Sequence, residues 1–226
     1  MWQKNNMKKA IITGASSGLG YEIAAKLLEK GVKVVNLSRN PSDLKLTNIK
    51  TDLTKNNDII NAIKTINEKH KDVDLLILCS GLMHWHNTGE NSLDEVDNDF
   101  SVNITGSIKI VNGIIDLIKK NKGDIVIIGS TASFTSNPGS SVYTAAKHAV
   151  LGFIKSLQIE LKKEDVRVIG FHPGGFKSQF HIKAKSDLKQ EELMDPKDLA
   201  NMLIAALELP RNMEVSEIII NRKNIK

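Results

Sequence analysis

The sequence predicts a single α/β domain, a doubly wound parallel sheet of seven strands with helices on both faces. Short apolar segments alternate along the chain with segments of helical periodicity, which is the pattern of such a sheet. Leu75–Leu78 is apolar at every position, as expected of a parallel strand that is buried on both faces. The chain has 226 residues, 41% of them hydrophobic, which fits one domain spanning 1–226 with a large core.

The predicted elements follow one another in a regular order. A strand at 8–13 leads through a glycine-rich turn into a helix at 21–30, whose apolar residues recur at helical spacing until Gly31 ends it. The other strands are expected at 32–37, 49–51, 75–78, 124–128, 166–171 and 215–220. The other helices are expected at 59–69, 93–100, 102–119, 141–163 and 196–209.

The turn after the first strand has glycines at positions 14, 18 and 20, in the arrangement Gly-x3-Gly-x-Gly. Glycine lets the backbone approach a pyrophosphate, and the N-terminus of the next helix offers unpaired N–H groups and the positive end of its dipole. The spacing differs from the usual Gly-x-Gly-x-x-Gly fingerprint. A simple tight loop is the alternative, so the turn alone does not establish a nucleotide site.

Ser130, Tyr143 and Lys147 carry the side chains that suggest a reaction. A Tyr and a Lys at i and i+4 share one helix face, so the ammonium group can lie close to the phenol oxygen. At about 4 Å and an effective dielectric near 20, the two would interact by roughly 4 kcal/mol, enough to lower the pKa of the phenol by up to ~3 pH units. Such a phenol can exchange protons near neutral pH. The alternative is an ordinary helical pair with packing and solvation roles.

The glycine turn and these three residues together resemble the short-chain dehydrogenase/reductase family, and the resemblance runs over nearly the whole chain. Further matching segments are Asn103 in Val-Asn-Ile-Thr-Gly, Asn137-Pro138-Gly139, and Pro173-Gly174 followed by Ser178 where the family usually has Thr. The resemblance implies a Rossmann fold and an enzyme that transfers hydride between a nicotinamide and a carbonyl or alcohol.

The resemblance also implies a role for each matched residue. Tyr143 would be the general acid, Lys147 would lower its pKa and bind the nicotinamide ribose, and Ser130 would orient the carbonyl. Asn103 would hold a water that links Lys147 to solvent. The implied cofactor-binding residues are Gly14, Ser16, Ser17, Gly18, Leu19, Gly20, Ser38, Arg39, Asp52, Leu53, Cys79, Ser80, Gly81, Tyr143, Lys147, Pro173, Gly174, Phe176 and Ser178.

The end of the second strand favours NADPH over NADH. An acid at this place accepts hydrogen bonds from the ribose 2′-hydroxyl, whereas a cation accommodates a 2′-phosphate. The segment here is Leu37-Ser38-Arg39-Asn40, which has no acid, and arginine is suited to bidentate phosphate contacts. Arg39 as a plain surface residue is the alternative.

Two segments depart from the family pattern. Cys79-Ser80-Gly81 stands where most members have Asn-Ala-Gly, and the Asn before it is Leu78, so the hydrogen bonds of both asparagines must be replaced or forgone. Cys79 is expected to pack and not to react. His84-Trp85-His86 would line the mouth of the pocket; a metal pair is the alternative, but no third ligand is evident.

The matched residues indicate the reaction, and the segments around them bear on the substrate. The segment 179–194, between the Pro-Gly turn and the last helix, is expected to be the substrate lid. A small or medium ketone or aldehyde is the first choice of substrate, and oxidation of an alcohol is the second. A 3-oxoacyl thioester reductase and a catalytically silent NADP(H)-binding sensor stay open as alternatives.

Charge and composition bear on partners and location. The net charge of +5 is spread along the chain among acids, so nucleic-acid binding is not expected. No apolar run approaches 18 residues and no signal-peptide pattern is present, so no membrane association is expected. The single cysteine suits a reducing cytoplasm. Residues 1–6 are expected to be a loose extension. The resemblance to the short-chain dehydrogenase/reductase family implies a homodimer or homotetramer, because its members commonly associate through their long helices, here 102–119 and 141–163.

Overall fold

Seven parallel strands form one sheet in the computed structural model, which describes residues 7–178 and 192–223. The strand order is β3-β2-β1-β4-β5-β6-β7, so the chain moves outward from β1 in one direction and then from β4 in the other. The strands are β1 Lys9–Thr13, β2 Lys33–Ser38, β3 Thr47–Lys50, β4 Leu75–Leu78, β5 Asp124–Ile128, β6 Arg167–Pro173 and β7 Glu217–Ile220. The predicted doubly wound sheet is confirmed.

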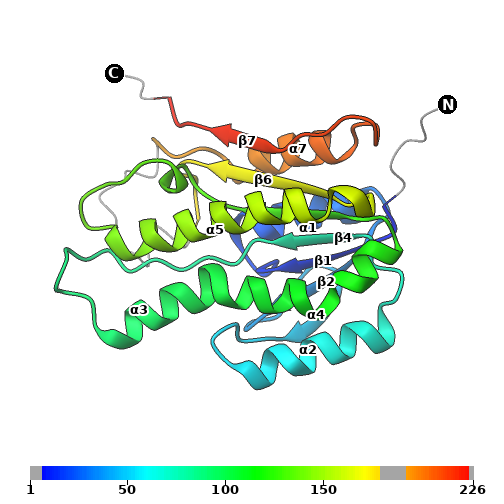
Figure 1. Cartoon of the computed structure of the whole chain (residues 1–226), viewed down its shortest axis with the longest axis horizontal. Helices are drawn as coiled ribbons and strands as arrows, with labels where there is room; N and C mark the ends of the chain where they lie inside the picture. Colours follow the sequence, from blue (N-terminus) through cyan, green and yellow to red (C-terminus); the bar gives the residue numbers. More distant parts are fainter. Residues whose placement is uncertain (1–6, 179–191, 224–226) are drawn as a thin grey trace.

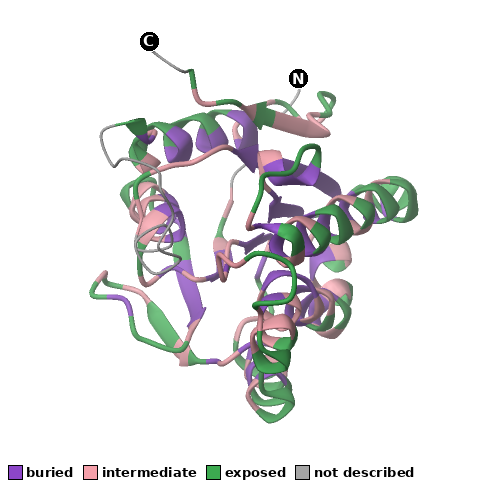
Figure 2. Cartoon of the chain, turned by 90° about the vertical axis from the view of Figure 1, so that its left-hand side faces the viewer, coloured by how far each residue is buried: buried purple, intermediate pink, exposed green. Residues whose placement is uncertain are grey.

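Helices cover both faces of the sheet (Figure 1), with the outward sides of the helices exposed and the central strands buried (Figure 2). One face carries α2 Asn56–Lys69, α4 Gly106–Lys120 and α5 Ser141–Glu160, and the other carries α1 Gly18–Glu29 and α7 Pro196–Leu207. Successive side chains of a strand point to opposite faces. Ile11 therefore packs in the first layer, whereas Ala10 and Ile12 pack in the second.

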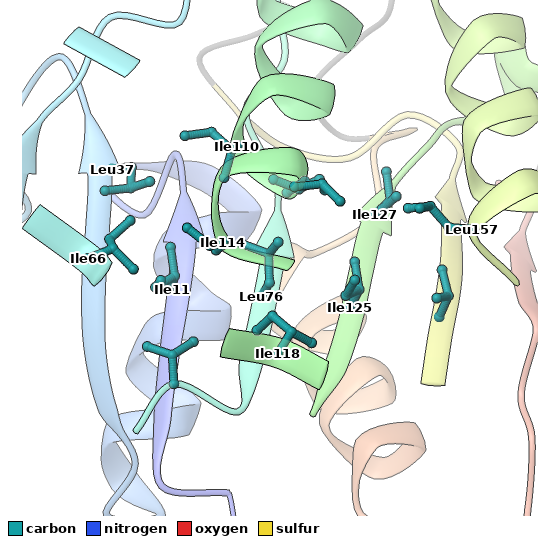
Figure 3. Packing of buried hydrophobic residues seen from close by; sticks show 14 of the residues in the cluster. Ile11, Leu37, Ile66, Leu76, Ile110, Ile114, Ile118, Ile125, Ile127 and Leu157 are labelled. Atoms are coloured by element: carbon teal, nitrogen blue, oxygen red, sulfur yellow. The ribbon is translucent and has the colours of Figure 1, made fainter. Parts of the chain in front are cut away.

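The core under α4 shows why this helix forms and where it lies. Ile110, Ile114 and Ile118 recur every four residues on one side of α4, and Figure 3 shows them over Leu76 and Ile125 of the sheet. Burying one such side chain contributes roughly 1.5–3 kcal/mol. This stripe fixes α4 against β4 and β5.

The helix before α4 differs from the prediction of two separate helices. α3, Leu93–Phe100, begins with a capping box between Ser92 and Glu95, and a π-helical segment, Ser101–Thr105, joins it to α4 without a break. The resulting helix Leu93–Lys120 has 28 residues and is long and apolar enough, by these two measures alone, to cross a membrane. Its buried stripe in the core accounts for that apolar character.

Other boundaries differ by a few residues. α1 begins at Gly18 instead of residue 21, because the last glycines of the turn already belong to its first turn. α5 ends at Glu160, and a 3-10 turn and Asp165, at φ 56°, carry the chain into β6. The predicted extension 1–6 lies outside the described residues, as does the predicted lid except for its last three positions.

A buried ion pair ties β5 to β6. Arg167 donates to both carboxylate oxygens of Asp124, at 2.9 and 2.6 Å, and also to the carbonyl oxygens of Leu207 and Leu209 at the end of α7. Only 1% of the Asp124 side chain and 9% of the Arg167 side chain are exposed. Removing one partner of such a pair leaves the other charge buried.

Arg167→Met is therefore expected to lower the free energy of unfolding by about 3 kcal/mol, the lower end of the range for buried pairs, because Arg211 still contacts Asp124. Thermal unfolding should show a melting temperature lower by roughly 10 °C. The control is Lys119→Met, which removes an exposed pair with Glu164 and should change stability by less than about 0.5 kcal/mol. Equal losses in the two variants would contradict the prediction.

Candidate active site

A cavity of about 1030 Å³ lies at the carboxyl edge of the sheet, where the loops that follow all seven strands meet. The predicted residues that line it are Gly14, Ser16, Ser17, Gly18, Leu19, Gly20, Ser38, Arg39, Asp52, Leu53, Cys79, Ser80, Gly81, Ser130, Tyr143, Lys147, Pro173, Gly174, Phe176 and Ser178. Of the predicted catalytic and cofactor-binding residues, Asn103 is the one that does not line this cavity. The structure thus brings together loops that are far apart in the sequence.

The glycine turn shapes one end of the cavity. Gly14 and Gly18 have φ angles of 82° and 58°, which side chains rarely adopt, and a Cβ on Gly20 would lie 2.4 Å from the Gly14 carbonyl oxygen. Asn36 of β2 fixes the turn, because its Oδ1 accepts from the N–H of Ala15 at 3.0 Å. The backbone is therefore held close to the start of α1.

Two polar features of this end fit a bound dinucleotide. The N-cap of α1, Ser17, makes no side-chain capping hydrogen bond, so the first N–H groups of the helix are available to an anion. The Ser178 hydroxyl is buried without a hydrogen-bond partner among the described residues, and its Cβ lies 3.5 Å from where a Cβ on Gly18 would be. The oxygens of a pyrophosphate can accept hydrogen bonds from the N–H groups of α1 and from the Ser178 hydroxyl.

The part of the cavity that follows β2 and β3 contains an exposed cation and an acid. Arg39 follows β2, and Asp52 follows β3. Burial raises the pKa of Asp52, but two hydrogen bonds from Thr54 and the charges of Arg39 and Lys55 together hold it below its usual value. Arg39 therefore lies close enough for its charge to act on Asp52, and it is an exposed residue that lines the cavity.

Lys147 and Tyr143 lie in the first two turns of α5. Lys147 is 4% exposed, and its Nζ donates to the carbonyl oxygen of Ile128 at 3.1 Å and lies 5.6 Å from the centroid of the Tyr143 ring. Burial lowers the pKa of Lys147 to about 8, which the neighbouring Cys79 opposes. The ammonium group is thus placed beside the ring, inside the protein, at the carboxyl end of β5.

Ser130 and Tyr143 are hydrogen-bonded to each other through their side chains, but the expected lowering of the tyrosine pKa is wrong in this structure. Burial raises the pKa of Tyr143 to about 12; the hydrogen bond with Ser130 lowers it, and the charge of Asp99 raises it further. Desolvation of this phenol, which is 9% exposed, is the largest cause and outweighs the hydrogen bond with Ser130. The phenol is therefore protonated at neutral pH.

Asn103 lies behind the cavity, in the π-helical segment. Its Nδ2 donates to the carbonyl oxygens of Leu82 at 2.6 Å and Asp99 at 2.8 Å. It thereby fixes the loop after β4 to the helix α3. Its proposed part in holding a water stays a prediction.

Backbone hydrogen bonds hold the loop after β4 in place. The backbone N–H groups of Cys79 and Ser80 both donate to Thr13 Oγ1, at 3.0 and 3.1 Å, which joins β4 to β1. Burial raises the pKa of the Cys79 thiol to about 12, so it is a poor thiolate, in agreement with the packing role expected of it.

The segment His84-Trp85-His86 contacts carboxylates, a feature that the sequence did not indicate. His84 Nδ1 lies 2.9 Å from Asp99 Oδ1, and His86 Nε2 lies 3.3 Å from Glu95 Oε1. The sequence predicts that this segment lines the mouth of the pocket; Trp85 lines the cavity, but His84 and His86 do not. Within residues 7–178 and 192–223, no group of three His, Cys, Asp or Glu side chains could hold a metal ion.

Asn221 and Arg222, which follow β7, also line the cavity and were missed from the sequence. No motif marks them. Their position depends on β7 pairing with β6, which brings the end of the chain beside Gly174.

Comparisons with known proteins agree with this geometry. The short chain dehydrogenase family matches residues 8–189. An uncharacterised oxidoreductase of Staphylococcus saprophyticus is 30% identical, with 94% of this chain and 96% of that protein covered. A glycine betaine reductase of Emericella nidulans is 28% identical over 96% of this chain, which spans only 19% of that longer protein.

Solved structures give the same fold. An alcohol dehydrogenase from Thermococcus sibiricus, complexed with 5-hydroxy-NADP, has a TM-score of 0.87 at 24% identity, covering 98% of this chain and 100% of that one. A 3-ketoacyl-(acyl-carrier-protein) reductase from Brucella melitensis, complexed with NADH, has a TM-score of 0.84 at 25% identity, covering 94% of this chain and 96% of that one. With most of its length matched by the family and with the strand order and cavity described above, the chain belongs to the short-chain dehydrogenase family of oxidoreductases.

Proposed function

We propose that the protein is an NADP(H)-dependent oxidoreductase that interconverts the carbonyl and alcohol forms of a small or medium substrate. The observation that carries the proposal is the convergence of Ser130, Tyr143 and Lys147 at one cavity that also contains the glycine turn. Solved relatives hold nicotinamide cofactors of both kinds, which supports a nicotinamide here without deciding which. A bound NADPH would supply the hydride.

The residues of the chain would supply the proton and the alignment. Tyr143, protonated at neutral pH, would donate its hydroxyl proton to the carbonyl oxygen, and Ser130, already hydrogen-bonded to it, would hold that oxygen in place. Lys147 would hold the nicotinamide ribose and place a positive charge beside the phenol as its proton leaves.

The apolar side chains that line the cavity favour a ketone or aldehyde whose other substituents are apolar. Leu82, Met83, Trp85 and Pro138 line the cavity near Tyr143. A 3-oxoacyl thioester is the second candidate, because the Brucella reductase is named for that substrate and is 25% identical. A silent NADP(H)-binding sensor is the alternative of another class, and the complete set of reactive side chains argues against it.

The decisive assay follows NADPH oxidation with a panel of aldehydes, ketones, diketones, quinones and 3-oxoacyl thioesters. Turnover of any of them is expected, with the rate rising with substrate concentration. Tight NADPH binding without turnover of any compound would favour the sensor instead.

Arg39 is expected to set the cofactor preference. Arg39→Gln removes a bidentate partner for the 2′-phosphate, so the Kd of NADPH should rise roughly 10- to 100-fold while that of NADH changes by less than about threefold. Titration calorimetry with both cofactors measures this. The control Lys45→Gln removes an exposed lysine that does not line the cavity and should leave both constants unchanged. An equal loss for NADPH and NADH, or a parent protein that prefers NADH, would count against the assignment.

We further propose a cytoplasmic homodimer or homotetramer whose subunits meet through α4 and α5. Ile159 on α5 is 78% exposed, and an interface would cover it. Sedimentation velocity of the parent protein and of Ile159→Lys measures the assembly.

A further inference from the structure

A buried asparagine, Asn36, lies in β2 between two apolar core residues, Val35 and Leu37. Asn36 is 1% exposed, and burying a polar side chain to this extent is costly unless its amide group finds hydrogen-bond partners. Its Oδ1 accepts from the Ala15 N–H at 3.0 Å and from the Ser38 hydroxyl at 2.7 Å. Asn36 therefore joins the glycine turn to the carboxyl end of β2.

The Nδ2 atom of Asn36 extends this connection to β3. It donates to Asn48 Oδ1 at 2.9 Å. Asn48 binds both backbone groups of Ser42, because its Oδ1 accepts from the Ser42 N–H at 2.9 Å and its Nδ2 donates to the Ser42 carbonyl oxygen at 3.3 Å. Ser42 is 7% exposed, although it lies in the loop between β2 and β3. A continuous chain of hydrogen bonds thus runs from the glycine turn to this loop.

This chain of hydrogen bonds holds a short arch, residues 39–41, at both of its ends. The Ser38 hydroxyl on one side of the arch and the Ser42 backbone on the other are bound to the two asparagines. Arg39 is the first residue of the arch, and it lines the cavity. Because both ends are held, the backbone of Arg39 has a defined position relative to the glycine turn.

We propose that Asn48, itself bound by Asn36, is a positioning residue that holds Arg39 in place for the 2′-phosphate of NADP(H). A side chain that is already held in its binding geometry binds more tightly than one that must first be ordered, because ordering costs conformational entropy. The same hydrogen bonds set the separation between the arch and the glycine turn, which are the two phosphate-binding parts of the site. The inference rests on the proposed function, since it takes Arg39 as the partner of the 2′-phosphate.

Asn48→Ala removes both contacts with Ser42 and leaves those of Asn36 with Ala15 and Ser38 in place. The variant is expected to fold, because position 48 is exposed on the edge strand β3, where water can replace the acceptor that Asn36 loses. The Kd of NADPH should rise roughly 3- to 10-fold, and that of NADH by less than about twofold. Titration calorimetry with each cofactor measures both constants.

A double-mutant cycle shows whether Asn48 acts through Arg39. In an Arg39→Gln background, the further change Asn48→Ala should alter the Kd of NADPH by less than about twofold, because no cation is left to position. A merely structural contribution would weaken NADPH binding by the same factor in both backgrounds and would weaken NADH binding equally. That result would overturn the proposal, as would an Asn48→Ala variant that binds NADPH as tightly as the parent.

Asn121→Ala is the matched control, because Asn121 also binds backbone groups, donating to the carbonyl oxygens of Lys71 and Val73 at 3.0 and 2.7 Å, but does not line the cavity. It should lower the melting temperature at least as much as Asn48→Ala and leave both Kd values unchanged.

The same titrations separate this inference from the cofactor assignment. A parent that binds NADH as tightly as NADPH, or an Arg39→Gln variant that keeps the preference for NADPH, would overturn the cofactor assignment and the inference with it. A preference that depends on Arg39 but survives in Asn48→Ala would overturn the positioning role alone.

Discussion

Tyr143→Phe is expected to lower the turnover number by roughly 10²–10⁴-fold, the usual contribution of a positioned general acid. The change removes one hydroxyl from a side chain that is 9% exposed, so the ring can keep its place in the cluster with Met83 and Trp85. What is lost is the proton that must reach the carbonyl oxygen as hydride arrives. NADPH binding should change by less than about threefold, because Lys147 and the glycine turn are untouched.

The measurement is steady-state turnover together with the Kd of NADPH. Tyr21→Phe is the matched control, since it makes the same substitution outside the cavity and should retain the parent turnover. A Tyr143→Phe variant that kept a tenth or more of the activity would show that another group donates the proton. Loss of NADPH binding together with turnover would indicate a role in cofactor binding instead.

The fold could be predicted from the sequence because its signals are local. A strand that is buried on both faces, such as β4, must be apolar throughout, and α4 must carry its apolar residues at helical spacing. The ends of the helices were predicted less accurately, because they depend on contacts beyond the local sequence pattern. The start of α1 depends on how the glycine turn closes onto Asn36, and the join between α3 and α4 depends on a π-helical segment that no local pattern specifies.

The candidate site was predictable to the extent that it consists of strand ends. Residues such as Gly14 and Ser130 follow parallel strands directly, so the order of the strands places them at one edge. The pair of His84 and Asp99 was not predictable, because it forms between a loop and a helix whose relative position is set by packing. The predicted direction of the Tyr143 pKa shift was wrong because the sequence shows the neighbouring Lys147 but not how deeply the phenol is buried, and this burial raises its pKa.

Lys147→Met is expected to abolish most turnover and yet to make the protein more stable at neutral pH. Burial lowers the pKa of Lys147 from its ordinary 10.5 to about 8, so at pH 7 the folded protein holds an ammonium group that would be better solvated in the unfolded chain. That difference corresponds to roughly 3 kcal/mol. Methionine has a similar shape and no charge. The Ile128 carbonyl loses its donor at a cost of about 1 kcal/mol, which leaves a net gain of roughly 2 kcal/mol.

The pH dependence of stability separates this account from a simple packing effect. Between about pH 8 and pH 10.5 the unfolded chain binds the Lys147 proton more strongly than the folded protein does, so the parent gains stability as the pH rises through that window. Lys147→Met should lack this gain, and its advantage over the parent should shrink as the pH rises from 7 to 10. Chemical denaturation at several pH values measures both, with Lys64→Met, an exposed lysine of α2, as the control. A variant less stable than the parent at pH 7 would mean that the ammonium group stabilises the fold. The expected gain would instead mean that the fold tolerates a destabilising charge beside the ring of Tyr143.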